Sequence, residues 1–194
     1  MFKTISKCRI CGSEHLISVM ALGEQALTGV FPHSRSEKIT TGPVELVKCS
    51  GVDGCGLVQL KQSYDRNELY GMNYGYRSGL NASMVRHLHS KVAKILTLDV
   101  LEPGDLVIDI GSNDATTLRA YPENNFQLVG IDPTAIKFSS YYPTEIVLIA
   151  EFFSADVVAK ILSGKKAKII TSFSMFYDLE DPIAFAREIE ASLS

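Results

Sequence analysis

The feature that most constrains the fold is an alternation of strand-like and helix-like segments that begins near residue 106. Short apolar runs predict strands at residues 106–110, 127–131, 145–149 and 168–172, and helices are predicted at 116–121, at 155–162 and from 181 onward. Strands that are separated by helices favour a parallel, doubly wound sheet, and therefore the α/β class. Such sheets normally continue beyond a fourth strand, so we expect the chain to be part of a longer protein.

Two helices on either side of these strands can be described in more detail. The last one is predicted to begin at Asp181 and Pro182, which suit an N-cap and a first turn. Its shared apolar face is expected to consist of Ile183, Ala186, Ile189 and Leu193. Another helix is predicted over residues 81–98, with an apolar face of Met84, Leu88, Val92, Ile95 and Leu96. Before it, residues 63–81 are rich in tyrosine, glycine and asparagine and are expected to form an ordered loop.

The N-terminal third carries all four cysteines, as two pairs, and strand-like pieces at 44–47 and 57–60. Cys8 and Cys11 are separated by two residues, which is typical of a metal-binding turn, whereas Cys49 and Cys55 have a longer spacer. Four thiolates satisfy zinc without an open coordination position, so the sequence predicts a structural zinc site. The alternative is four unrelated thiols, and His15, which could replace one thiolate, is expected to be solvated. Redox chemistry is disfavoured because the first pair does not open a helix after a core strand.

Composition and charge exclude several classes of partner. The net charge is −3, and no run of basic residues forms a nucleic-acid footprint. No segment approaches the roughly 20 apolar residues of a membrane span, and the N-terminus lacks an apolar signal core. We therefore expect a cytoplasmic protein without nucleic-acid or membrane partners, in which four cysteines are metal ligands rather than disulfides.

Acidic and small residues follow the first two predicted strands of the sheet. Asp109 favours a cationic group such as the ammonium of a methionine moiety, and Gly111 allows a ligand to approach the backbone closely. Asp132 ends the second strand, where a carboxylate can accept both hydroxyls of a ribose. After the third strand, Glu151, Phe152 and Phe153 can flank an adenine. The phosphate-binding pattern G-x-G-x-x-G is absent here, so these residues favour S-adenosylmethionine over NAD.

Taken together, these motifs resemble the S-adenosylmethionine-dependent C-methyltransferases that act on nucleotide-linked deoxysugars. The resemblance is carried by Cys8-x-x-Cys11-Gly12, residues 55–60, the tyrosine-rich block 70–81, Asp109-Ile110-Gly111-Ser112-Asn113-Asp114, Gly130-Ile131-Asp132-Pro133, residues 152–154 and residues 175–182. Two positions depart from the family pattern: Ala115 replaces a glycine, and the second cysteine pair is C-x5-C rather than C-x2-C.

The resemblance implies a zinc-ribbon-like module over residues 1–62, a tyrosine-rich loop and connecting helix over 63–100, and a partial class I methyltransferase domain, Rossmann-like, over 101–194. It implies zinc bound by Cys8, Cys11, Cys49 and Cys55. It implies S-adenosylmethionine bound by Tyr76, Ser78, Asp109, Gly111, Ser112, Asn113, Asp114, Asp132, Pro133, Glu151, Phe152, Phe153 and Ser172. It implies a nucleotide-linked keto sugar beside Tyr74, Tyr76, Met175, Phe176 and Tyr177, with the catalytic base beyond Ser194.

Two other functions remain open from the sequence, namely a zinc-containing RNA methyltransferase and a non-catalytic zinc adaptor with a degenerate nucleotide-binding fold. The net charge of −3 counts against the RNA enzyme. Because the predicted sheet ends at its fourth strand, we also expect the chain to be inactive alone and to self-associate through the exposed sheet edge.

Overall fold

The computed structural model describes residues 2–27, 32–71, 74–123 and 125–194, which form two compact units. The first unit comprises Met1–Gly75 and Phe176–Ala184, and the second comprises Tyr76–Met175 and Phe185–Ser194. The segment 63–100, expected as one connector, is thus divided between the units after Gly75. Met72 and Asn73 of the predicted tyrosine-rich loop lie outside the described residues, as do residues 28–31 of the predicted zinc module.

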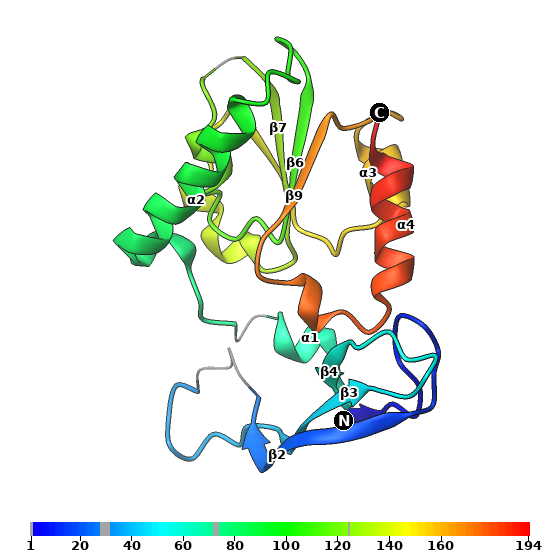
Figure 1. Ribbon diagram of the computed structural model, residues 1–194. Coiled ribbons are helices and arrows are strands. Elements are labelled where there is room, and N and C mark those ends of the chain that lie inside the picture. The colour runs from blue at the N-terminus through cyan, green and yellow to red at the C-terminus, as the bar shows by residue number, and fades with distance from the viewer. Residues whose placement is uncertain (1, 28–31, 72–73, 124) are drawn as a thin grey trace. The chain divides into compact units, whose positions relative to one another are not determined.

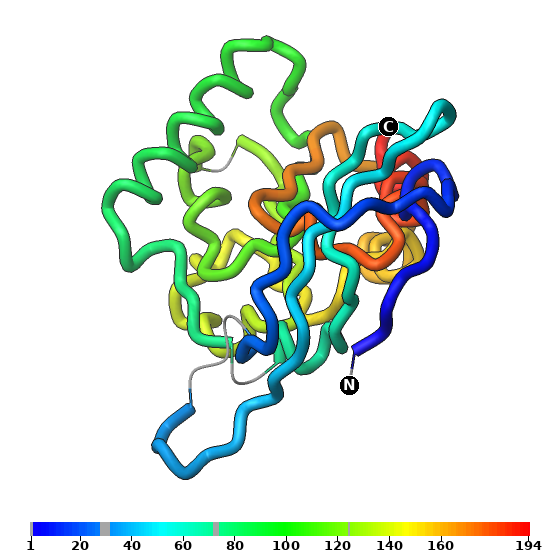
Figure 2. The backbone as a smooth tube through the Cα atoms, turned by 60° about the horizontal axis from the view of Figure 1, so that its bottom comes forward, coloured from blue at the N-terminus to red at the C-terminus, as the bar shows by residue number. Residues whose placement is uncertain are grey.

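The first unit contains two small antiparallel sheets. β1 (Phe2–Thr4) pairs with β5 (Gln62–Tyr64), while β2 (Leu16–Ala26), β3 (Thr41–Cys49) and β4 (Val58–Leu60) form a three-stranded sheet with β3 in the middle. Along most of their length β2 and β3 run side by side (Figure 2). The strand-like pieces predicted at 44–47 and 57–60 lie in β3 and β4. The central strand buries Val47 and Cys49, so one cysteine pair begins at the end of a well-packed strand.

The stretch expected as loop, residues 63–81, contains the helix α1 (Arg66–Leu69) and the 3-10 turn η1 (Ser78–Leu80). The side chain of Asp65 accepts hydrogen bonds from the backbone N–H groups of Asn67 and Glu68. These bonds satisfy two donors that a helix start leaves unpaired. The loop prediction was therefore wrong at α1, because a single capping residue outweighs the weak helix pattern of so short a segment.

The second unit is built on a four-stranded parallel sheet in the order β8–β7–β6–β9. Its strands are β6 (Leu106–Ile110), β7 (Gln127–Ile131), β8 (Ile146–Ile149) and β9 (Ile169–Ser172), which confirms the predicted α/β class and the four strand positions within one residue. All five residues of β6 are buried, as expected for a central strand that helices cover on both faces. The parallel register brings the carboxyl ends of β6, β7 and β9 to one edge of the sheet.

Helices cover both faces of this sheet (Figure 1). On one face lies α2 (Ala82–Leu96), whose N-cap Asn81 was the predicted start of that helix and whose Leu88 and Val92 are buried. Val92 packs in the main core cluster with Val107 of β6. On the other face lie α3 (Ala155–Ile161) and α4 (Pro182–Ser192). Among the described residues, none of the helices has the length and apolarity that crossing a membrane requires.

Two helix predictions need correction. Residues 116–121 were expected to begin a helix but form only the 3-10 turn η2 (Leu118–Ala120), because Pro122 disfavours helical backbone at Tyr121. A second 3-10 segment, η3 (Ala135–Tyr141), joins β7 to β8.

The other correction concerns the buried face of α4. Asp181 caps the helix as predicted, because its carboxylate accepts the backbone N–H of Ala184 at 2.9 Å. However, the expected face is turned outward: Ile183, Ala186 and Leu193 are exposed and Ile189 is half-buried. Phe185 is buried instead, and its ring packs against that of Phe153 with 5.5 Å between centroids. The contact with Phe153 keeps the Phe185 ring inside, and this rotation of the helix leaves the aliphatic stripe outside.

Candidate functional site

The four cysteines meet at one point of the first unit. Their sulfur atoms all lie within 4.8 Å of one another. The Sγ atoms of Cys8 and Cys55 are 3.6 Å apart, and those of Cys11 and Cys49 are 3.5 Å apart. Zinc–sulfur bonds of about 2.3 Å in a tetrahedron separate the sulfurs by about 3.8 Å. The donor set and its spacing therefore fit one zinc ion, and the C-x5-C spacer does not prevent the two pairs from meeting.

The surroundings of Cys8 favour a thiolate. Burial opposes ionisation, but hydrogen bonds from the backbone N–H groups of Cys11 and Ile10 and from Gln59 lower the pKa of Cys8 from 9.0 to about 6. Gln59 Nε2 donates to Cys8 Sγ at 3.2 Å, while Gln59 Oε1 accepts from the backbone N–H of Arg9 at 3.1 Å. This buried amide fixes the orientation of a sulfur, which is the usual role of groups behind metal ligands.

The other sulfurs differ in environment. A backbone hydrogen bond at Leu57 lowers the pKa of Cys55, but burial and the neighbouring thiols outweigh it and raise the pKa to about 11. His15 is exposed and does not belong to this four-residue group in the part of the chain that the structure describes. Cys8 and Cys11 lie in a turn rather than at a helix start.

In the second unit, the turn that follows β6 has an unusual backbone. Gly111, Asn113 and Ala115 all have positive φ, at 72°, 51° and 60°. This conformation is disfavoured for residues with a Cβ, so glycine would suit the position of Ala115 better than alanine. The turn is kept here with alanine, whose side chain is fully buried. Gly111 is exposed, and a Cβ there would lie 3.6 Å from Cγ of Met175.

Asp132, at the end of β7, ties this turn to the next one. Its Oδ2 accepts the backbone N–H of Asn113 at 2.8 Å, and its Oδ1 accepts both the N–H and the hydroxyl of Thr134 at 2.7 Å. A carboxylate has about four acceptor positions, so one position on Oδ2 remains for a further donor.

Tyr142 makes a second connection between the two turns. Its hydroxyl is 2.8 Å from Ser112 Oγ and donates to the backbone carbonyl of Asn113 at 3.1 Å. Gly130 of β7 leaves the room for this contact, because a Cβ there would lie 2.6 Å from Ser112 Oγ. Sequence reasoning missed Tyr142, since no local pattern marks a tyrosine that reaches back to an earlier turn.

Asp109 lies deeper than expected for a ligand contact. It is 2% exposed, and Thr171 Oγ1 of β9 donates to its carboxylate at 2.6 Å. Burial raises the pKa of Asp109 from 3.8 to about 7, although bonds from Thr171 and Thr117 favour the ionised form. Asp109 therefore lies behind this edge of the sheet, bonded to β9 rather than open to a ligand.

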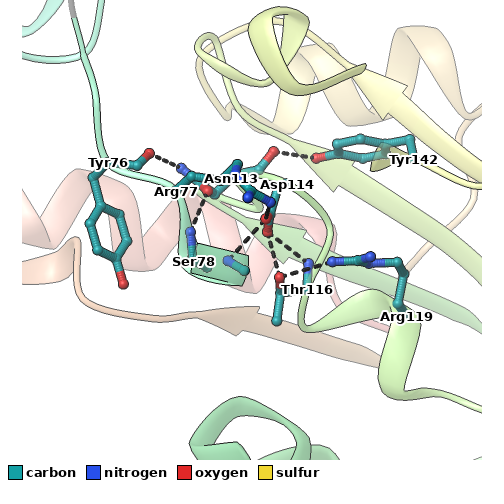
Figure 3. Close-up of polar contacts among 9 residues, drawn as sticks. Tyr76, Arg77, Ser78, Asn113, Asp114, Thr116, Arg119 and Tyr142 are labelled. Carbon is teal, nitrogen blue, oxygen red and sulfur yellow. Dashed lines mark hydrogen bonds and ion pairs between the residues drawn. The ribbon is translucent and has the colours of Figure 1, made fainter. Parts of the chain in front are cut away.

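The segment Tyr76–Leu80, named here the strap, lies along the turn after β6 (Figure 3). Asn113 joins them twice: its Oδ1 accepts the backbone N–H of Ser78 at 2.9 Å, and its Nδ2 donates to the carbonyl of Tyr76 at 3.0 Å. Tyr76 and Ser78, both predicted cofactor contacts, thus reach the turn through their backbones. The ring of Tyr76 is 41% exposed and points away from Asn113 (Figure 3).

The remaining predicted cofactor residues lie in or next to the carboxyl ends of β7, β8 and β9. Glu151 is exposed, whereas Pro133, Phe152 and Phe153 are half-buried, and the ring of Phe153 packs on Phe185. Ser172 ends β9 opposite Ile110, and its hydroxyl is buried without a hydrogen-bond partner among the described residues. An unpaired buried hydroxyl at this edge is suited to a ligand that supplies the missing partner.

The predicted substrate-side residues are divided between the units. Met175 and Tyr76 belong to the second unit, where Met175 lies beside Gly111. Tyr74, Phe176 and Tyr177 belong to the first unit. There the Tyr74 and Tyr70 rings lie 5.5 Å apart, and the Tyr70 hydroxyl donates to the carboxylate of Asp178. Burial, and then this carboxylate, raise the pKa of Tyr70.

Comparison with known proteins finds a family model that matches the N-terminal module. Residues 8–70 match the family model described as "Putative zinc binding domain". The chain is also similar to the C-methyltransferase NovU of Streptomyces niveus, with 27% identity over 133 residues that cover 68% of this chain. The chain spans 31% of the length of this curated relative.

Solved structures give weaker likenesses. The plantazolicin methyltransferase BpumL, solved with a triazolic desmethylPZN analogue and SAH, is 18% identical, with a TM-score of 0.46 over 60% of this chain and 46% of that chain. YjhP from E. coli is 14% identical, with a TM-score of 0.38 over 56% of this chain and 44% of that chain. These TM-scores are low, and the α/β assignment rests on the described sheet itself. The resemblance carried by the motifs is confirmed by the family match and by NovU: residues 8–70 match the zinc-binding family model, and the chain is similar in sequence to a C-methyltransferase.

Proposed function

We propose that this chain binds S-adenosylmethionine and belongs to an enzyme that methylates a carbon atom of a nucleotide-linked keto sugar. The observation that carries the proposal is the pair of interlocked turns after β6 and β7, which present exposed backbone at Gly111 and a spare acceptor position on Asp132. The similarity to NovU, a C-methyltransferase, supports the reaction class.

The residues at the sheet edge fit the proposed cofactor. Asp132 retains an acceptor position for a ribose hydroxyl, and the buried hydroxyl of Ser172 lacks a partner among the described residues. A pyrophosphate would be repelled by the carboxylate of Asp132, which favours a methionine-containing cofactor over a dinucleotide. When bound, S-adenosylmethionine supplies an electrophilic methyl group on its sulfonium sulfur.

The proposed role of this part of the protein is to bind and to position. Transfer of a methyl group is an in-line displacement, whose rate depends strongly on the alignment of the two reactants. We place Met175 beside the transferred methyl group because it lies next to the exposed Gly111. A sugar carbon becomes nucleophilic only after a proton next to a carbonyl has been removed, so the substrate should be a keto sugar.

We further propose that Cys8, Cys11, Cys49 and Cys55 bind one zinc ion in a structural role. All four sulfurs point to one centre, so a tetrahedral ion would have no position left for substrate. Gln59 would keep the Cys8 sulfur in place through its hydrogen bond of 3.2 Å.

The first experiment is calorimetric titration of this chain with S-adenosylmethionine, S-adenosylhomocysteine and NAD. We expect both adenosyl ligands to bind and NAD not to bind. A chain that holds zinc and is folded, but binds neither adenosyl ligand, would contradict the proposal and favour a non-catalytic zinc adaptor.

The second experiment tests the reaction with isotopically methyl-labelled cofactor and the longer protein to which this chain is expected to belong, because the chain alone is expected to be inactive. We expect label on the carbon of nucleotide-linked keto sugars, and none on matched sugars whose carbonyl has been reduced to a hydroxyl, because these lack an acidic C–H bond. Transfer of label to RNA, or to the reduced sugars, would refute the proposed substrate class.

A further inference from the structure

Asp114 was expected to contact the cofactor, but its surroundings assign it elsewhere. Its side chain is 0% exposed. Oδ2 accepts from the guanidinium of Arg77 at 3.1 Å and from the backbone N–H of Gly79 at 2.9 Å. Oδ1 accepts from the hydroxyl of Thr116 at 2.5 Å and from its backbone N–H at 3.2 Å. These four bonds fill the acceptor positions of the carboxylate and leave none for a ligand.

Arg77 is held on two sides. One side is the ion pair with Asp114, in the turn after β6. On the other side, the guanidinium carbon lies 4.3 Å from the centre of the Tyr141 ring, at the end of η3 after β7. Arginine is suited to such a position because its planar group can bond a carboxylate and stack on an aromatic ring together. One side chain of the strap therefore contacts both the turn after β6 and the end of η3.

The packing of the strap is tight at this point (Figure 3). A Cβ at Gly79 would lie 2.5 Å from Asp114 Oδ2 and 3.1 Å from Arg77 Nη1. Only glycine allows the backbone N–H at this position to approach the buried carboxylate so closely. Arg119 donates a hydrogen bond to the Thr116 hydroxyl at 3.1 Å and so helps to hold Thr116 beside Asp114.

We propose that Arg77 and Asp114 form a latch that fixes the strap against the turn after β6 and the end of η3, and that both are positioning residues rather than cofactor contacts. The left-handed residues Asn113 and Ala115 make the turn after β6 costly to hold, so contacts from outside the turn must maintain it. The consequence for cofactor affinity rests on the proposed function, whereas the latch itself does not. Opening the latch should loosen the strap and, through the turn, weaken cofactor binding.

The chain contains no tryptophan, which allows the strap to be observed directly. Leu80 is 71% exposed at the end of the strap, so Leu80→Trp introduces one indole there with little disturbance. Quenching of its fluorescence by acrylamide reports how mobile and exposed the strap is. In this background we would compare Arg77→Met, Arg77→Lys, Asp114→Asn and the double variant Arg77→Met/Asp114→Asn, with Arg86→Met on the exposed side of α2 as the matched control.

We expect Arg77→Met and Asp114→Asn to increase quenching and to weaken binding of S-adenosylmethionine about tenfold, a change of about 1.4 kcal/mol by calorimetry. The double variant should be little worse than either single variant, because the two residues act as one pair. Arg77→Lys keeps the charge but loses the planar group, so its quenching and its cofactor affinity should lie between those of the wild type and Arg77→Met. This variant also tests the latch if the other variants fail to fold. Arg86→Met should change neither readout.

The latch and its effect on cofactor affinity are refuted by different results. If acrylamide quenches the Arg77 and Asp114 variants no more than Arg86→Met, no latch exists, whether or not the cofactor binds. If quenching increases but cofactor affinity is unchanged, the positioning role is refuted. Failure of the parent chain to bind S-adenosylmethionine refutes the proposed function, and the quenching pattern still decides on the latch.

Discussion

Asp109 tests directly how the second unit is stabilised, because it is a carboxyl group buried within a parallel sheet. The side chain is 2% exposed and lies on the face of β6 that packs toward α2. Burial raises its pKa from 3.8 to about 7, so the folded protein keeps a proton that the unfolded chain releases near pH 4. We expect this proton to make the stability of the unit depend on pH.

The sign and size of the effect follow from linkage. The folded state binds the proton more tightly than the unfolded state, so stability falls as the pH rises from about 4 to about 7 and changes little above that range. A pKa that moves from 3.8 to about 7 corresponds to about 4 kcal/mol, as an upper estimate. Of this, about 2–3 kcal/mol is lost between about pH 5 and pH 8.

Asp109→Asn removes the titration and keeps an acceptor for the Thr171 hydroxyl. The free energy of unfolding of the variant, relative to that of the wild type, should therefore rise by about 2–3 kcal/mol between about pH 5 and pH 8. Urea unfolding followed by far-UV ellipticity measures this difference, since α2 and α3 lie in the second unit. Asp99→Asn is the control, because it makes the same change at an exposed position whose left-handed backbone asparagine tolerates. Parallel pH profiles for Asp109→Asn and the wild type would show that Asp109 is ionised in the folded protein.

Three further predictions concern the zinc module and the two turns. Protein purified without added metal should contain one zinc per chain, and elemental analysis that finds iron, or no metal in folded protein, would contradict this. Cys8→Ser or a strong chelator should unfold the first unit, because structural zinc supplies its folding energy. Asp132→Ala should weaken binding of S-adenosylmethionine by at least about tenfold, whereas the control Asp156→Ala, on the exposed start of α3, should not weaken it. If calorimetry gives the Asp132→Ala variant the same affinity as the wild type, Asp132 does not belong to the site. Gly130→Ala places a Cβ 2.6 Å from Ser112 Oγ and 2.9 Å from the Tyr142 hydroxyl, so it should cost about 1–3 kcal/mol of stability. An unchanged melting temperature would mean that the contact between Ser112 and Tyr142 is dispensable.

The sequence by itself was sufficient for features that depend on a few neighbouring residues. Apolar runs placed β6, β7, β8 and β9 within one residue, because a strand buried on both faces must be apolar almost throughout. The start of α2 at Asn81 and the cap of α4 at Asp181 could be predicted for the same reason, since a cap bonds to N–H groups only two or three residues away. The zinc module could be predicted because the chain holds only four cysteines.

Only the tertiary structure decided which side chains serve the site and which support it. Asp109, Asp114 and Asp132 look alike in the sequence, yet Asp109 is buried against Thr171, Asp114 is saturated by the strap and Thr116, and Asp132 joins the two turns and keeps an acceptor position. The difference arises from partners far along the chain, such as Arg77 for Asp114, and no local pattern records them. The outward face of α4 has the same origin, because contact between Phe185 and Phe153 settles which of two apolar stripes is buried. Periodicity shows that a helix has an apolar stripe, but packing against the rest of the protein determines which stripe faces the core.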